Sequence, residues 1–178
     1  MKRHINLETV RKSIRNIPDF PKPGIHFKDV STSYQHGEIF GFISSEIFEH
    51  YKDAGITKVI GIESRGFILG GVLAYKLNAG FIPIRKPGKL PSETYSQSYE
   101  LEYGFDTLEI HKDALSVDDI VLIHDDLLAT GGTIGAAIDL VRKFGISKIF
   151  VNFFVELDFL KGIDKIDMSV PCWSLIHF

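Results

Sequence analysis

The chain has 178 residues, a length that corresponds to one domain of ordinary size. Hydrophobic residues make up 44% of the chain and charged residues 24%, which excludes a disordered or fibrous protein. The 20 Lys and Arg residues against 23 Asp and Glu give a net charge of −3, which excludes a dedicated nucleic-acid binder and a polybasic membrane-surface protein. We therefore expect neither a nucleic-acid nor a membrane partner. A single cysteine, Cys172, and the absence of any apolar run of about 20 residues indicate a cytoplasmic protein.

The N-terminal part of the chain is expected to contain two amphipathic helices. Leu7, Val10, Ile14 and Ile17 recur at helical spacing up to Pro18, which predicts the first helix. The following stretch, residues 20–24, contains two prolines and must be extended or turning. The core face of the second helix is marked by Ile39, Phe42, Ile43, Ile47, Phe48 and Tyr51.

From residue 58 onward, short apolar runs alternate with helical patterns. Strands are predicted at 58–62, 81–84, 107–111, 120–123 and 149–155, with 173–178 as a candidate edge strand. Helices are predicted at 66–77 and 133–144. This alternation predicts an α/β domain with a mostly parallel sheet flanked by helices. In such sheets ligands bind at the carboxyl ends of the strands, so the loops that follow the strands are the candidate site.

The strongest candidate is the segment that follows the strand at 120–123. Asp125 and Asp126 come first, and Ala-Thr-Gly-Gly-Thr at 129–133 then opens a helix. Free N–H groups and the positive dipole end at a helix start bind anions, so a phosphate fits this loop. The two carboxylates suit sugar hydroxyls or the water shell of Mg²⁺. An isolated Asp-Asp pair would more simply cap a turn, but the small-residue loop directly behind it favours a ligand site.

A second strand-to-helix loop contains Gly61, Ser64, Arg65 and Gly66. Its spacing is that of a P-loop, but Phe67 and Ile68 stand where Lys and Ser or Thr are required, so a P-loop NTPase is excluded. No Gly-x-Gly-x-x-Gly dinucleotide motif, zinc-ligand spacing or Gly-x-Ser-x-Gly nucleophile motif occurs. What remains is a second candidate anion site, in which Arg65 could equally be a structural ion-pair partner.

The polar segment between Arg85 and Glu102 is long for a loop. Connections beyond about 12–15 residues without secondary structure are usually lids or linkers. Arg85, Lys86 and Lys89 place three cations at its first end. We interpret the segment as a flexible loop. Its composition alone predicts a solvated surface loop and no binding role.

These segments together resemble type I phosphoribosyltransferases. The strand followed by Asp-Asp-Leu-Leu-Ala-Thr-Gly-Gly-Thr at 125–133 is similar to their motif for phosphoribosyl diphosphate (PRPP), and its Leu-Leu-Ala variant resembles the adenine phosphoribosyltransferases. Three further stretches agree in order and spacing, namely 21–29, 63–67, and 85–91 leading to Leu-Glu-Tyr-Gly at 101–104. The resemblance covers about residues 14–144. It implies one domain over 1–178, in which about residues 1–35 pack as a hood that recognises the base.

The resemblance further implies transfer of the 5-phosphoribosyl group from PRPP to adenine, giving AMP and pyrophosphate, with Mg²⁺ held mainly by PRPP and water near the acidic pair. PRPP ribose and 5-phosphate would contact Asp125, Asp126, Ala129, Thr130, Gly131, Gly132 and Thr133. Pyrophosphate would contact Ser64, Arg65, Arg85, Lys86 and Lys89. Adenine would contact His26, Phe27 and Lys28, with Phe27 stacking on the purine. Glu102 matches the catalytic acid/base, and the position of Arg85 implies a homodimer.

Three positions depart from the family pattern. Lys28 replaces the usual Arg, so a point charge stands in place of a fork of donors, with consequences for the positioning of Glu102. His26 replaces an aliphatic residue but would act through its backbone. His124 also replaces an aliphatic residue, and an outward-facing, inert side chain is favoured over one that tunes Asp125.

Two alternatives stay open. One is a transferase for xanthine, hypoxanthine or a pyrimidine, against which residues 24–29 and the Glu102 segment argue. The other is a purine-sensing regulator that binds PRPP without catalysis. A regulator would need a DNA-binding module, for which the residues before Pro18 are too few, and it would not need Glu102.

Overall fold

The computed structural model describes residues 5–101 and 104–178, so Glu102 lies outside the described residues. The chain divides into two compact units, Met1–Glu49 and His50–Phe178, which are taken in turn. None of the helices within the described residues combines the length and apolar character needed to cross a membrane. The single domain with an N-terminal hood stays a prediction.

The first unit begins with α1 (Leu7–Ser13), whose N-terminus is capped by Asn6, with the side-chain oxygen accepting from the Thr9 N–H at 2.9 Å. The helix ends four residues before the Ile17 expected from its periodicity, so that part of the prediction is wrong. Residues 15–18 form β1 (Arg15–Pro18) instead, because they pair antiparallel with β2 (His26–Asp29). The short helix α2 (Ser31–Tyr34) follows, and α3 (Gly37–Tyr51) leads into the second unit.

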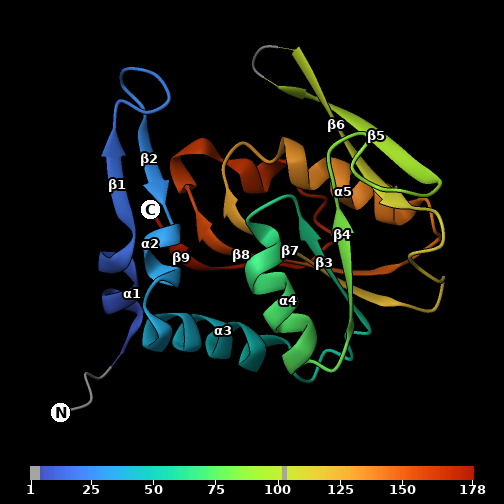
Figure 1. The fold of residues 1–178 in the computed structure, drawn as a ribbon, viewed down its shortest axis with the longest axis horizontal. Helices are drawn as coiled ribbons and strands as arrows, with labels where there is room; N and C mark the ends of the chain where they lie inside the picture. Colours follow the sequence, from blue (N-terminus) through green and yellow to red (C-terminus); the bar gives the residue numbers. More distant parts are fainter. Residues whose placement is uncertain (1–4, 102–103) are drawn as a thin grey trace. The chain divides into compact units, whose positions relative to one another are not determined.

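The second unit is built on a five-stranded parallel sheet with the strand order β4-β3-β7-β8-β9 (Figure 1). The strands are β3 (Lys58–Ile62), β4 (Gly80–Ile84), β7 (Ile120–Leu128), β8 (Lys148–Glu156) and β9 (Cys172–His177). The helices are α4 (Gly66–Lys76) and α5 (Gly132–Arg142), with the 3₁₀ turns η1 (Asp158–Leu160) and η2 (Gly162–Lys165). The α/β class, the parallel sheet and the edge strand at the C-terminus are confirmed.

Both faces of this sheet are covered. Ile60, Ile62 and Ile123 belong to a buried cluster that includes Ile134 and Ile138 of α5. On the other face α4 approaches closely, because Gly61 leaves no side chain in the way: a Cβ there would lie 2.9 Å from the Gly66 carbonyl oxygen and from the Phe81 ring. Because β3, β7 and β8 are buried on both faces, most of their successive positions are apolar, with buried polar exceptions such as His124, Asp126 and Asn152.

The segment after Lys89 is not structureless. Residues 94–101 form β5 (Thr94–Leu101), which pairs antiparallel with β6 (Gly104–His111), and the two strands extend as a ribbon beside α5 (Figure 1). The expected strand at 107–111 is therefore longer, and the expected loop is mostly strand. Alternate residues of β5 face inward, as the Tyr95 ring shows by lying 5.2 Å from the Phe144 ring. The flexibility of this segment stays a prediction.

Candidate active site

The anion loop lies between β7 and α5. The strand extends to Leu128, beyond the residue 123 expected, so Asp125 and Asp126 are strand residues and only residues 129–131 form the loop. Gly131 caps α5 with φ +81°, a left-handed conformation that glycine adopts without strain. A cavity is lined by Asp125, by residues 129–133 and by Phe153. The free N–H groups at the start of α5 make this loop suitable for a phosphate.

The acidic pair lies beside Arg65, with Asp126 buried and Asp125 half-buried. Burial raises the pKa of Asp125, and the neighbouring Asp126 raises it further. Burial also raises the pKa of Asp126, although Arg65 opposes this effect. The Arg65 Nε atom lies 2.5 Å from Asp126 Oδ2, in an ion pair. Arg65 thus pairs with Asp126 and lowers the pKa of Asp125 through its charge, and the two carboxylates retain lone pairs that ribose hydroxyls or a hydrated cation can use.

The loop between β3 and α4 lies next to the acidic pair. A second cavity is lined by Glu63, Ser64, Arg65, Asp125 and Asp126, and the Glu63–Ser64 peptide is cis. Glu63 accepts hydrogen bonds from the Lys86 backbone N–H at 3.0 Å and from Arg85 Nε at 3.1 Å. These two donors lower the pKa of Glu63. The structure therefore brings Ser64, Arg65, Arg85, Asp125 and Asp126 to one edge of the sheet, as expected from their places after β3, β4 and in β7.

The remaining predicted cations lie near the same loops. Lys86 Nζ contacts Asp106 Oδ2 and lies 3.3 Å from the Tyr99 hydroxyl oxygen. Thr133 of the anion loop donates from Oγ1 to the same Tyr99 oxygen, also at 3.3 Å. The backbone carbonyl of Lys89 accepts from Arg85 Nη1 at 3.2 Å. The β5–β6 ribbon is thus attached to both candidate anion sites.

The residues predicted to bind the base lie in the first unit, on β2. The rings of Phe20 and Phe27 pack edge to face with centroids 5.2 Å apart. His26 is exposed, and its Nδ1 lies 3.3 Å from Asn16 Nδ2 on β1. Lys28 pairs with Asn16 in the strand register. These contacts hold the strand that carries the three residues, and their role toward a base stays a prediction.

His124 does not face outward, so this expectation is wrong. It is fully buried, because β7 is a central strand with both faces covered. Its Nδ1 lies 2.8 Å from Asn152 Oδ1, and the Asn152 amide nitrogen donates to the Trp173 carbonyl at 3.0 Å. This arrangement assigns the proton to Nδ1. Burial lowers the pKa of His124 to about 4, so the side chain is neutral near pH 7 and adds no charge beside Asp125.

This buried histidine predicts a specific acid sensitivity. Because its pKa falls from 6.5 to about 4 on folding, the unfolded chain binds the proton first, and stability is lost as pH falls from about 6.5 through 4. The depression corresponds to roughly 3 kcal/mol at most. We expect His124→Gln to lose clearly less stability than the wild type between pH 7 and pH 4. Urea midpoints of both proteins at the two pH values measure this, and equal losses would contradict it.

Four residues important for the site were missed by sequence reasoning. Glu63 holds Arg85 and the Lys86 backbone, while Asp106 and Tyr99 hold the Lys86 side chain. Gly162 of η2 packs so tightly on the anion loop that a Cβ there would overlap the Ala129 carbonyl oxygen. The alternation of residues 94–101 could have revealed the strand that carries Tyr99. No local pattern marks Gly162, because its role comes from contact with a loop distant in sequence.

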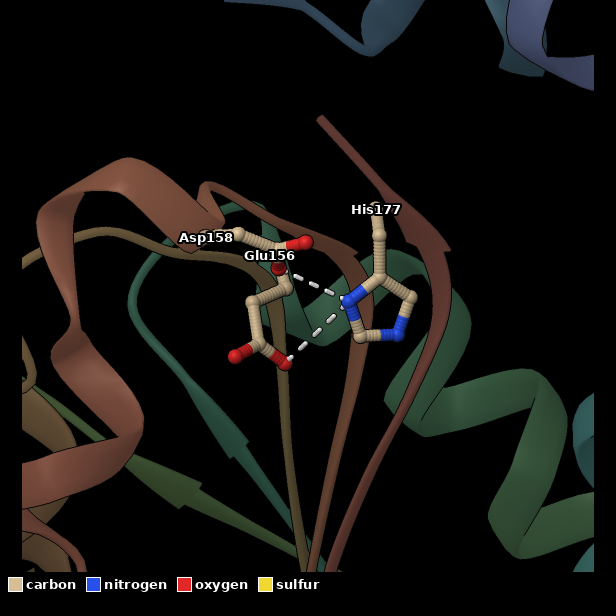
Figure 2. Close-up of side chains that lie close together, drawn as sticks. All are labelled: Glu156, Asp158 and His177. Carbon is tan, nitrogen blue, oxygen red and sulfur yellow. Dashed lines mark hydrogen bonds and ion pairs between the residues drawn. The ribbon is translucent and has the colours of Figure 1, made fainter.

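A cluster of Glu156, Asp158 and His177 lies at the carboxyl ends of β8 and β9 (Figure 2), where Glu156 pairs in register with Leu128, the residue before the anion loop. Figure 2 shows the His177 Nδ1 facing both carboxylates, 2.8 Å from Asp158 Oδ1 and 3.9 Å from Glu156 Oε2. Three such ligand atoms within 4.8 Å of one another could hold a metal ion. Ser174 Oγ donates to Glu156 at 2.7 Å, so the groups also satisfy one another. We interpret the cluster as a set of structural contacts that hold the C-terminal strand β9 in place.

A parallel sheet with an acidic pair in its central strand, an anion loop at the next helix start and a facing arginine defines a type I phosphoribosyltransferase domain. In agreement, residues 31–168 match the phosphoribosyl transferase domain family. The adenine phosphoribosyltransferase of Bacteroides fragilis strain ATCC 25285 is 60% identical over 171 residues, covering 95% of this chain and 96% of that protein. The Bacteroides thetaiotaomicron enzyme of the same name is 61% identical over 155 residues, covering 87% and 88%.

Solved structures agree with these relatives. The adenine phosphoribosyltransferase of Rhodothermus marinus matches with a TM-score of 0.91 at 48% identity, covering 97% of this chain and 98% of that one. The Giardia lamblia enzyme, solved in complex with 9-deazaadenine, matches with a TM-score of 0.93 at 42% identity, covering 98% of each chain. The chain therefore belongs to the adenine phosphoribosyltransferase family.

Proposed function

We propose that the protein transfers the 5-phosphoribosyl group from PRPP to adenine, giving AMP and pyrophosphate in purine salvage. The observation that carries this proposal is the anion loop at 129–133, with Asp125, Asp126 and Arg65 beside it. Family membership supports adenine as the base. So does the crystal structure of the Trypanosoma brucei adenine phosphoribosyltransferase, which is 26% identical and was solved in complex with AMP, pyrophosphate and ribose-5-phosphate.

The role of each residue in the site follows from the charge of the substrate group that it would contact. The anion loop holds the 5-phosphate through N–H groups of α5 and the Thr130 and Thr133 hydroxyls. Ser64 and Arg65, with Arg85, Lys86 and Lys89, receive the pyrophosphate and stabilise the negative charge that develops as it leaves. Asp125 and Asp126 bind the ribose hydroxyls and stabilise positive charge on the ring. Phe27 stacks on adenine, the backbone of His26 and Lys28 reads its edge, and Glu102 accepts the proton that the base loses.

We propose Mg²⁺ as the cofactor, since the carboxylate oxygens of Asp125 and Asp126 suit the water shell of a hard cation. When bound with PRPP, it supplies neutralising charge to the pyrophosphate group. Replacing both residues by Asn should weaken PRPP binding and reduce its dependence on Mg²⁺. Calorimetric titration of PRPP at several Mg²⁺ concentrations measures this, and an unaltered Mg²⁺ dependence would contradict the role of the pair.

The proposal includes a homodimer in the cytoplasm. Exposed apolar side chains on α4, Ile68 and Tyr75, support a second copy of the chain as a partner of the second unit. Light scattering of the purified protein measures its mass in solution, and a monomer would contradict this part. The cytoplasmic location has its support in the single cysteine, Cys172.

The test of the function is pyrophosphate release from PRPP and Mg²⁺, with adenine, hypoxanthine, guanine and xanthine offered separately. Release with adenine alone, with an equal amount of AMP, is expected. Release with another base would support PRPP as the donor substrate but contradict the assignment of adenine as the acceptor. PRPP binding without release on any base would favour the regulator.

A further inference from the structure

Three of the cations predicted to receive pyrophosphate are paired with carboxylates of the same chain. Arg65 pairs with Asp126, and Arg85 pairs with Glu63. Lys86 pairs with Asp106. Asp126 and Glu63 belong to the loops and strand of the candidate site, whereas Asp106 comes from β6 of the ribbon and lies in none of the recognised motifs. Its presence beside Lys86 therefore calls for its own explanation.

The Asp106 carboxylate is held in place independently of Lys86. Its Oδ1 accepts from the Thr107 backbone N–H at 2.8 Å, and its Oδ2 accepts from the Tyr99 hydroxyl at 3.1 Å. Tyr99 is its direct partner across the β5–β6 register. With one oxygen fixed by backbone and the other by Tyr99, the carboxylate stays beside Lys86 when that lysine takes another partner.

Lys86 is also within reach of solvent. Its side chain is 37% exposed, and that of Asp106 is 28% exposed. An anion can therefore approach the ammonium group without unfolding the ribbon. The Tyr99 hydroxyl oxygen accepts hydrogen bonds from both Lys86 Nζ and Thr133 Oγ1 of the anion loop. The backbone N–H of Lys86 donates to Glu63, which also holds Arg85. Lys86 therefore lies between the loop for the 5-phosphate and the part of the site that contains Arg85.

We propose that Asp106 is a positioning residue that competes with pyrophosphate for Lys86 and so weakens the binding of this product. This inference rests on the proposed function, which makes pyrophosphate a ligand of the site. A pyrophosphate that binds Lys86 must share the lysine with the fixed Asp106 carboxylate, at the cost of repulsion between like charges. The fixed carboxylate therefore lowers the affinity for the anion and favours its release.

The test is the affinity of inorganic pyrophosphate, in the presence of Mg²⁺, for the full chain and its variants. We expect Asp106→Asn to bind pyrophosphate about two- to fivefold more tightly than the wild type, the size expected for a partly exposed ion pair. The asparagine oxygen can still accept from the Thr107 backbone N–H, and its amide nitrogen can donate to the Tyr99 hydroxyl oxygen in place of the bond that Oδ2 accepts, so the ribbon keeps its contacts. Calorimetric titration gives the dissociation constants, and product inhibition by pyrophosphate in the adenine assay should strengthen in parallel.

A double-mutant cycle separates this mechanism from a general change of charge. In a Lys86→Met background, Asp106→Asn should leave pyrophosphate affinity unchanged, because the contested lysine is gone. Equal tightening in both backgrounds would overturn the inference, as would unchanged or weaker binding by Asp106→Asn alone. Glu93→Gln is the matched control, since Glu93 pairs with Lys112 at 3.1 Å at the opposite end of the same ribbon. A wild type that is inactive with adenine and PRPP would instead refute the proposed function.

Discussion

Replacing Glu102 with glutamine is expected to lower turnover with adenine at least about tenfold, because general-base catalysis contributes typically 10²–10⁴-fold. Glutamine keeps the size and hydrogen-bonding capacity of the side chain but cannot take the proton that adenine loses as N9 forms the new bond. PRPP binding should be nearly unchanged, since no phosphate or ribose contact is assigned to this residue. Steady-state turnover with saturating substrates, together with PRPP titration, measures both effects.

A matched control is Glu100→Gln. Glu100 is two residues earlier in the sequence, lies in β5 and is exposed, so the change removes one carboxylate charge at a nearby position of the chain. Its turnover should stay close to that of the wild type. If Glu102→Gln turned over as fast as the wild type, Glu102 would not be the base. If both variants were equally slow, the loss of a negative charge rather than the loss of proton transfer would be responsible.

The fold of the second unit could be predicted because its sheet is buried on both faces. Residues 58–62, 120–123 and 149–155 are apolar runs of a length typical of strands, and helical patterns separate them. Burial on both faces favours apolar residues at nearly every position, and this preference leaves a strong local pattern. The order of the strands in the sheet is not visible in any such run.

The elements that sequence reasoning missed depend on pairing rather than on composition. Ile14 and Ile17 continue a helical period, yet residues 15–18 form a strand because β2 offers them a partner. Residues 94–101 are polar and therefore suggest a loop, but their alternation fits a ribbon with only one face covered. In both cases a contact with a later segment decides the structure.

In the candidate site too, local motifs could be predicted from the sequence, whereas contributions from distant segments could not. The loop at 129–133 and the residues Ser64 and Arg65 are local motifs, so their spacing alone indicates an anion site. Asp106 and Gly162 act on that site from distant segments. His124 was misjudged because the strand was expected to end at residue 123, whereas β7 continues inside the protein to Leu128.

Replacing Gly131 with alanine is expected to abolish measurable PRPP binding. A Cβ at this position would overlap the carbonyl oxygen of Gly162, which is backbone and cannot turn away. The left-handed φ of +81° adds about 1–2 kcal/mol of strain for any residue with a side chain. The loop must therefore shift, and its N–H groups lose the geometry that a phosphate needs. Calorimetric titration of PRPP with Mg²⁺ measures the binding, and thermal unfolding measures the loss of stability.

The control for this prediction lies one turn later in the same helix. A Cβ at Gly135 would meet nothing within 4 Å, so Gly135→Ala should bind PRPP like the wild type. It should also stabilise the fold by about 0.4–1 kcal/mol, because alanine restricts the unfolded chain more than glycine does. For a domain of this size, 1 kcal/mol raises Tm by roughly 2–4 °C. Normal PRPP binding by Gly131→Ala would show that the tight contact with Gly162 does not shape the phosphate site, whereas weakened binding by both variants would place the effect in α5 as a whole.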